Sequence, residues 1–236
     1  MSEYRLTDLF IRPLAFSEVI EQAAGSAEEA REQGLVSLED SLKDLDWPEP
    51  FARFFRFGVQ LVIDGADAEV VRDIMASEHR ALLERMTYRW EKWKGLLLYL
   101  TEHDPLGDDA LDFVYAGLYA GHQDNGDLLT CLEEFLTVLF GKTPRKLGSL
   151  QLEDFPEDYM EHPLVYSNLQ LFVLREKLLK SRLEATLNDQ YVFYEQDIQR
   201  CFRMLLEACL LIHQGASGEV TRDILSAMCG HEPVTE

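Results

Sequence analysis

Six histidines are the first candidates for catalysis or metal binding in this 236-residue chain. A zinc site on one helix would place two of them in an H-x-x-x-H or H-E-x-x-H pattern. No pair has that spacing among His79, His103, His122, His162, His213 and His231. The chain also lacks the glycine-rich phosphate loop, the nucleophile elbow and the triad spacing of common enzymes. We therefore expect no catalytic residue, no metal site and no cofactor, and a protein that is not an enzyme.

Residues 121–127 look at first like a metal-binding loop, because His122, Asp124 and Asp127 lie close together in the sequence. A calcium-binding loop, however, needs ligands at alternating positions and a terminal bidentate glutamate, and this segment has neither. Asn125 and Gly126 are typical of a turn between two elements. The segment therefore predicts a turn between helices.

The charge of the chain limits its partners. It has 43 acidic and 22 basic residues, which give a net charge of -21. Phosphate binding needs clustered lysine and arginine, so this balance argues against nucleic acid and against an anionic membrane surface. A basic protein surface would complement the acidic one, although acidic side chains also serve solubility alone.

The sequence predicts a cytoplasmic protein without membrane helices. Its longest apolar stretches are far shorter than the roughly 20 residues of a bilayer-spanning helix. The first residues lack the basic region and apolar core of a signal peptide. The four cysteines are spread out and form no C-x-x-C pair, which favours reduced thiols; they are Cys131, Cys201, Cys209 and Cys229.

A sequence repeat organises the chain. The pattern G-A-x-x-E-V-x-R-D-I occurs once from Gly65 to Ile74 and again from Gly215 to Ile224. Such a repeat indicates a duplicated structural unit. In each copy an apolar helix precedes the glycine, which ends that helix cheaply in the left-handed conformation. Asp67 and Ser217 are then placed to cap the helix that follows, so these four residues are predicted to be structural.

Helical periodicity runs through most of the chain. Residues 51–62 carry apolar side chains at i, i+3, i+4 and i+7, the spacing of residues on one face of a helix. The helix after Asp67 is expected to run to about Trp93, with Ile74 directed inward. Val220 and Ile224 are expected on the apolar side of the corresponding second-copy helix. Arg72-Asp73 and Arg222-Asp223 recur in both copies and are interpreted as ion-pair residues that tie the helix pair to its neighbour, a structural role.

The expected architecture is all-α, with two related helical-hairpin units joined by a helical connector. The first unit covers residues 1–93 and the second, more divergent unit covers 166–236. Between them, residues 94–165 form the connector, which includes a helix face at residues 111–119. The connector ends in a stretch rich in proline and acid, residues 143–163, which is predicted to be a linker.

The first copy and the segment before it resemble a known family. Residues 30–39 read A-R-x-x-G-L-x-x-L-E, and the later turn reads D-G-x-D-x-E. This ordered set is similar to the cytoplasmic part of MotA, the flagellar stator subunit of the MotA/TolQ/ExbB superfamily. The resemblance covers residues 18–93 and, more faintly, residues 166–230. MotA subunits have four transmembrane helices, none of which has a counterpart here, so a proton channel is not expected.

The resemblance also implies partner-binding residues. The charged residues of this MotA segment are implicated in contacts with the rotor protein FliG, and the matching positions are Arg31 and Glu39. The aligned positions before the second copy are Arg175 and Glu184. A purely structural interpretation stays open, in which Arg31 and Glu39 are solvated and Arg31 pairs with Glu28 or with another neighbour three or four residues away.

Two hypotheses of function without catalysis follow from the sequence, and a helical enzyme with an unrecognised site is the third. The first is a soluble, non-channel protein-interaction module, located in the cytoplasm at the flagellar motor or a related membrane motor complex. Its partner would be FliG, another rotor or switch-complex protein, or a further motor component. The alternative is a helical adaptor or chaperone-like scaffold unrelated to motility. Homo-oligomerisation stays open in both.

Overall fold

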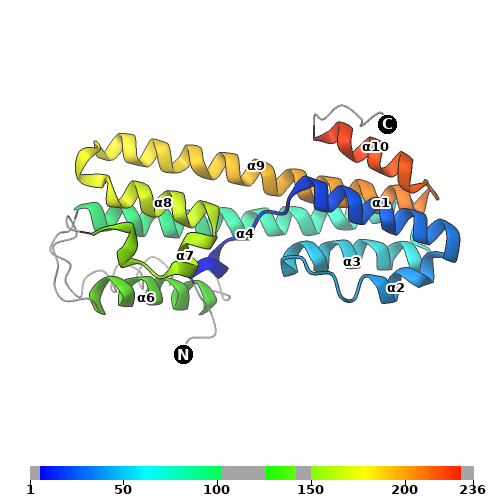
Figure 1. The fold of residues 1–236 in the computed structure, drawn as a ribbon, viewed down its shortest axis with the longest axis horizontal. Helices are drawn as coiled ribbons and strands as arrows, with labels where there is room; N and C mark the ends of the chain where they lie inside the picture. Colours follow the sequence, from blue (N-terminus) through cyan, green and yellow to red (C-terminus); the bar gives the residue numbers. More distant parts are fainter. Residues whose placement is uncertain (1–5, 103–125, 142–149, 230–236) are drawn as a thin grey trace. The chain divides into compact units, whose positions relative to one another are not determined.

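The computed structural model describes residues 6–102, 126–141 and 150–229 (Figure 1). Within these ranges the secondary structure is helical and contains no strand, which confirms the all-α class. The elements are η1 (Leu6–Leu9), α1 (Phe16–Gln33), η2 (Leu35–Ser37), α2 (Leu38–Ser41), α3 (Glu49–Ile63), α4 (Ala68–Glu102), α6 (Gly126–Gly141), η4 (Leu152–Asp154), α7 (Glu157–Glu161), α8 (Pro163–Val173), η5 (Arg175–Lys177), α9 (Lys180–His213) and α10 (Gly218–Met228), where η denotes a 3-10 helix.

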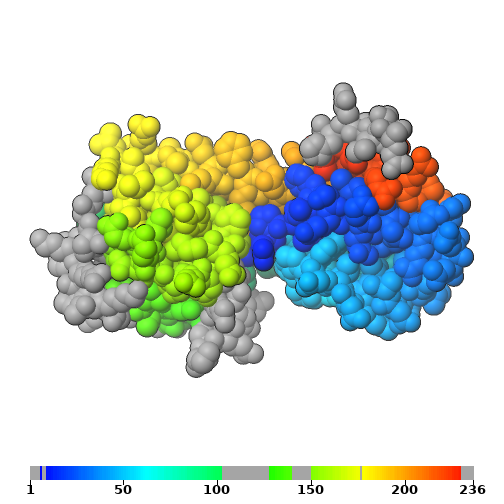
Figure 2. Space-filling view, in the orientation of Figure 1, coloured from blue at the N-terminus to red at the C-terminus, as the bar shows by residue number. Residues whose placement is uncertain are grey.

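The chain forms two compact units (Figure 2). Unit 1 contains Met1–Arg12 and Glu84–Tyr194, and unit 2 contains Pro13–Leu83 and Glu195–Glu236. The borders between the units fall inside α4 and α9, so each of these long helices contributes to both units. This division differs from the expected boundaries at residues 93 and 165. Both copies of the repeat belong to unit 2.

The first helices of the two copies pack against each other in unit 2. The ring centroids of Phe51 in α3 and Phe202 in α9 are 4.7 Å apart. Seven residues further along both helices, a Cβ atom added at Gly58 would lie 2.6 Å from the Cys209 sulfur. The two helices therefore run in the same direction. Corresponding residues of the two copies are 150 positions apart in the sequence. The pairs in contact here, Phe51 with Phe202 and Gly58 with Cys209, are 151 positions apart, so the two helices pair corresponding positions with an offset of one residue.

The core of unit 1 is built around two tryptophans of α4. Trp90 stacks on Tyr191 of α9, with ring centroids 4.8 Å apart and ring planes 5° from parallel. The Trp93 indole donates a 2.9 Å hydrogen bond to Asn168 of α8 and meets the Phe135 ring of α6 edge-on. These contacts join four helices, and they satisfy the indole N–H inside the core.

Three predictions concern the middle of the chain. The acidic stretch predicted to be a linker contains η4 and α7 where it is described, and it buries Phe155 and Tyr159 in unit 1. The helix face expected at 111–119, the segment 121–125 and residues 142–149 lie outside the described residues. Gly126, predicted to lie in a turn, is the first residue of α6.

None of the described helices combines the length and the apolar character that a bilayer crossing needs.

Candidate functional site

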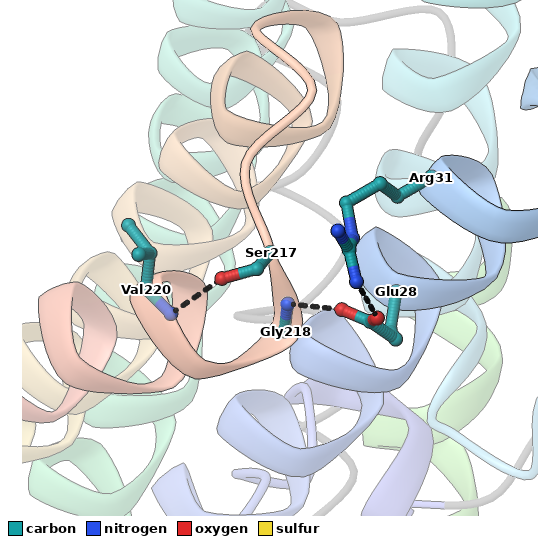
Figure 3. A network of polar contacts seen from close by, with 5 residues as sticks. All are labelled: Glu28, Arg31, Ser217, Gly218 and Val220. Carbon is teal, nitrogen blue, oxygen red and sulfur yellow. Dashed lines mark hydrogen bonds and ion pairs between the residues drawn. The ribbon is translucent and has the colours of Figure 1, made fainter.

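The polar residues around Arg31 join α1 to α10 in unit 2 (Figure 3). The Glu28 carboxylate accepts a 2.9 Å hydrogen bond from the backbone N–H of Gly218 and a 2.5 Å hydrogen bond from the Arg31 guanidinium. The bond from Arg31, and next the bond from Gly218, hold the pKa of Glu28 below its ordinary value. Gly218 begins α10, so Glu28 supplies an acceptor and a negative charge at a helix N-terminus.

The absence of a side chain at Gly218 allows this close approach. A Cβ atom there would lie 2.8 Å from the Ala24 carbonyl oxygen of α1 and 3.3 Å from the Glu28 Cβ atom. Ser217 precedes it as the N-cap residue, and its hydroxyl accepts a 3.3 Å hydrogen bond from the Val220 N–H. The end of α10 is therefore held by a side-chain cap from its own chain segment and by Glu28 from α1.

A second ion pair links the same two helices. Arg222 of α10 donates two hydrogen bonds, of 3.0 and 2.8 Å, to the carboxylate of Glu21 in α1. The hydrogen bond with Arg222 lowers the pKa of Glu21. Both side chains are exposed, so the pair contributes more to the orientation of α10 than to stability.

The two first-copy candidates both lie at the surface of unit 2. Arg31 is in the last turn of α1 and Glu39 is in the first turn of α2. Between them Gly34 has a φ of 92° and ends α1, and buried Leu38 anchors α2 to the core. Arg31 pairs with Glu28, as the structural interpretation expected, yet its side chain is 53% exposed. We call the surface from α1 to α2 that carries Arg31 and Glu39 the α1–α2 corner.

The second-copy candidates are placed differently. Arg175 and Glu184 belong to unit 1, whereas Arg31 and Glu39 belong to unit 2. Arg175 is only 7% exposed, donates a 2.8 Å hydrogen bond to the Phe172 carbonyl oxygen, and lies over the Phe172 ring. Glu184 is partly exposed in α9. The Arg175 side chain is thus buried in unit 1, whereas Arg31 and Glu39 are exposed in unit 2.

The turn residues of the two copies have the same geometry. Gly65 and Gly215 have φ values of 78° and 71°, the left-handed region that favours glycine. The glycine N–H bonds to the carbonyl three residues earlier, and the next N–H bonds to the carbonyl five residues earlier, which is the Schellman pattern. The main-chain carbonyls of Asp67 and Ser217 accept from the Val71 and Thr221 N–H groups in the same way, and the Ser217 side chain also caps α10.

The helices that follow these turns expose the same side chains in both copies. Val70 and Ile74 are 45% and 38% exposed, and Val220 and Ile224 are 46% and 37% exposed. The inward placement expected for Ile74, Val220 and Ile224 is therefore not observed. We define the repeat surface by its exposed residues, which are Glu69, Val70, Arg72, Asp73 and Ile74 on α4 and Glu219, Val220, Arg222, Asp223 and Ile224 on α10.

Within residues 69–74 of α4 and 219–224 of α10, the residues shared by the two helices are the exposed ones, whereas the next position exposed in both copies, Ser77 against Ala227, differs. Each pair of corresponding residues on the repeat surface is identical, whereas the positions that are buried in both copies differ: Val71 against Thr221, and Met75 against Leu225. Surface substitutions usually cost little free energy, so packing alone would let the exposed positions diverge first. Sequence reasoning could have found this surface by asking which positions of the repeat are identical.

Replacing Thr221 by valine is expected to stabilise unit 2 by about 1 kcal/mol. Thr221 is fully buried, and its hydroxyl makes no hydrogen bond to any described residue. Valine keeps the shape and occupies the corresponding position of the first copy, Val71. Urea unfolding measures the change in the free energy of unfolding, with the labelling of the buried Cys201 and Cys209 thiols as the readout at each urea concentration.

The reciprocal substitution Val71→Thr is the matched control. It places a hydroxyl at a fully buried position and should lower the free energy of unfolding by about 1–3 kcal/mol. An equal or lower urea midpoint for Thr221→Val would contradict the assignment of an unsatisfied hydroxyl.

Part of the chain is similar to bacterial proteins named Motility protein A. The chain is 42% identical to the Motility protein A of Borreliella burgdorferi over 59 residues, 25% of this chain and 21% of that protein. It is 33% identical to the Motility protein A of Treponema phagedenis over 76 residues, 32% of this chain and 26% of that protein. It is 35% identical to the Motility protein A of Bacillus subtilis over 74 residues, 31% of this chain and 26% of that protein.

These matches are partial. No family model matches the chain, and no solved structure matches it with significance. The alignments cover only about a fifth to a quarter of the length of these relatives. Within that limit, the similarity confirms the predicted resemblance: part of this chain is similar to part of Motility protein A.

Proposed function

We propose that the chain is a non-channel protein-interaction module that binds a component of the flagellar motor or of a related motor complex. The observation that carries this proposal is the similarity to Motility protein A in three bacteria. Its role is binding rather than catalysis, and its proposed partner is a rotor or switch-complex protein such as FliG.

The α1–α2 corner is the proposed contact for that partner. Arg31 and Glu39 present opposite charges there, and both side chains are exposed. Their backbone is held by the turn at Gly34 and by the burial of Leu38. Glu28 further connects the corner to α10. Charges fixed on a supported backbone suit a partner that carries complementary charges, because charge complementarity speeds encounter and selects the partner.

Charge reversal at the corner is expected to weaken binding to purified FliG from the same cell. Arg31→Glu and Glu39→Arg should each raise the Kd about tenfold, chiefly through slower association, because each change turns an attraction into a repulsion. Biolayer interferometry with the full chain, at two salt concentrations, would measure both rates. The effect should shrink at the higher salt concentration.

Arg80→Glu serves as the matched control, since Arg80 is an exposed arginine of the same unit and its reversal changes the net charge equally. Its Kd should change less than that of Arg31→Glu. Equal Kd values for wild type and both corner variants would show that the α1–α2 corner does not contact the partner. Absence of binding to any motor component by the wild-type chain would favour the adaptor or scaffold hypothesis.

A further inference from the structure

The repeat surface occurs twice in unit 2 with nearly the same exposure in each copy. The valines differ by one percentage point in exposed fraction, and so do the isoleucines. Single exposed apolar residues are ordinary on protein surfaces. Here, however, an apolar pair with the same neighbours recurs on two helices whose buried residues differ. Core packing explains the buried residues and leaves the repeated exposed ones to another constraint.

Helix geometry shows how the side chains are arranged on α4. A helix turns by about 100° per residue, so Val70 and Ile74 share one flank and Arg72 lies on the opposite flank. Glu69 and Asp73 lie between the flanks, on the side away from the core. The same spacing places the corresponding residues of α10 in the same order. Each copy is therefore an apolar pair bordered by two carboxylates on its solvent side.

The arginine of the second copy already has a partner. Arg222 is bound by Glu21 of α1, with both carboxylate oxygens accepting. Its charge is thus offset on its own flank, while the two carboxylates of that copy face solvent. In α10 the apolar pair also continues one turn further to Met228, which is 37% exposed. The second copy consequently offers the longer apolar strip.

Charge decides what kind of molecule fits these two surfaces. A second copy of this chain would bring another net charge of -21 against the carboxylates, and nucleic acids and anionic lipids are disfavoured for the same reason. A helix with an apolar face and flanking lysine or arginine residues complements both the Val–Ile pair and the carboxylates.

We propose that each copy of the repeat surface binds one basic amphipathic helix of a partner protein, so that one chain binds two such helices. This proposal rests on the proposed function, because it requires the chain to be a protein-interaction module. It does not require the partner to be a motor protein. The repeat surface does not include Arg31 or Glu39. The α10 copy binds the more tightly of the two, since Met228 lengthens its apolar strip.

The test uses the full chain and a synthetic helical peptide of about 18 residues, with leucines on one face and lysines on the other. Isothermal titration should give two peptides per wild-type chain. Val70→Gln with Ile74→Gln should remove one site, and Val220→Gln with Ile224→Gln should remove the other. All four substitutions together should raise the Kd at least about tenfold. Glutamine leaves the net charge unchanged, so general attraction of lysine to an acidic protein stays the same.

Val192→Gln with Phe193→Gln is the control, an exposed apolar pair of α9 outside the repeat surface, and it should leave both sites intact. Unchanged binding by the four-substitution variant would overturn the proposal, as would no binding by wild type or equal binding of a leucine–glutamate peptide. If the four-substitution variant does not fold, the number of peptides bound by each double variant tests the proposal. One peptide per chain supports it, and two peptides per chain contradict it. A chain that binds the peptide but no motor protein refutes only the motor link.

Discussion

Replacing Phe202 by alanine is expected to destabilise unit 2 by about 3–5 kcal/mol, the range typical for removal of a buried phenylalanine. Phe202 is fully buried at the junction of three helices. Its ring lies 4.7 Å from that of Phe51, 4.9 Å from that of Phe54 and 5.2 Å from that of His79. Alanine would remove these contacts and leave a cavity between the two copies of the repeat.

Urea unfolding can assign this loss to unit 2. Burial raises the pKa of the Cys209 thiol, so Cys209 reacts with an alkylating reagent when unit 2 opens. Buried Cys131 reports on unit 1 in the same sample. Phe193→Ala is the matched control, because Phe193 is on the same helix but 68% exposed, and it should change stability by less than about 0.5 kcal/mol. A similar loss in both variants would contradict the assigned core.

Acid is expected to destabilise unit 1 through His162. The ring is almost fully buried and lies near those of Phe10 and Tyr194. Burial, with a smaller effect of the Arg12 charge, lowers the pKa of His162 from 6.5 to about 4. Between these two pKa values the unfolded chain binds the proton and the folded chain does not. Stability therefore falls as the pH drops from about 6.5 to about 4, and the difference corresponds to about 3 kcal/mol.

The measurement compares variants because many carboxylates titrate over the same pH range. In a Trp47→Phe background, fluorescence of the buried Trp90 and Trp93 follows the unfolding of unit 1. From about pH 7.5 to about pH 4, the wild type should lose about 3 kcal/mol more than His162→Gln. His213→Gln, at an exposed histidine, should lose as much as the wild type. Equal losses in the wild type and His162→Gln would contradict the neutral buried ring.

Local sequence was sufficient for the features that depend on neighbouring residues. The helical period of residues 51–62, the glycine stop and the capping serine correspond to α3, the two Schellman turns and the N-cap of α10. The family resemblance likewise came from residues in one ordered stretch. Each of these signals spans a few turns of chain, and their physical causes, backbone conformation and nearby hydrogen bonds, act over the same distance.

The functional surfaces depended on longer-range contacts. Periodicity placed Ile74 on the apolar face, yet the buried stripe of α4 contains Val71 and Met75 and leaves Ile74 on its flank. Arg175 looked like a surface charge, but packing against Phe172 buries its guanidinium. For Ile74, exposure is decided by which distant segment covers which side of α4, whereas the contacts given for Arg175 are with a residue three positions earlier in the chain.

The sequence by itself determined an all-α chain, a duplicated turn and a resemblance to part of a motility protein. Tertiary structure decided that both copies share unit 2 and that α1 holds α10 through Glu28 and Glu21. It also decided that the identical residues between positions 69 and 74, and between positions 219 and 224, are exposed. The physical reason is that helix formation is satisfied within a few turns, whereas burial of a helix face depends on contacts between residues far apart in the chain.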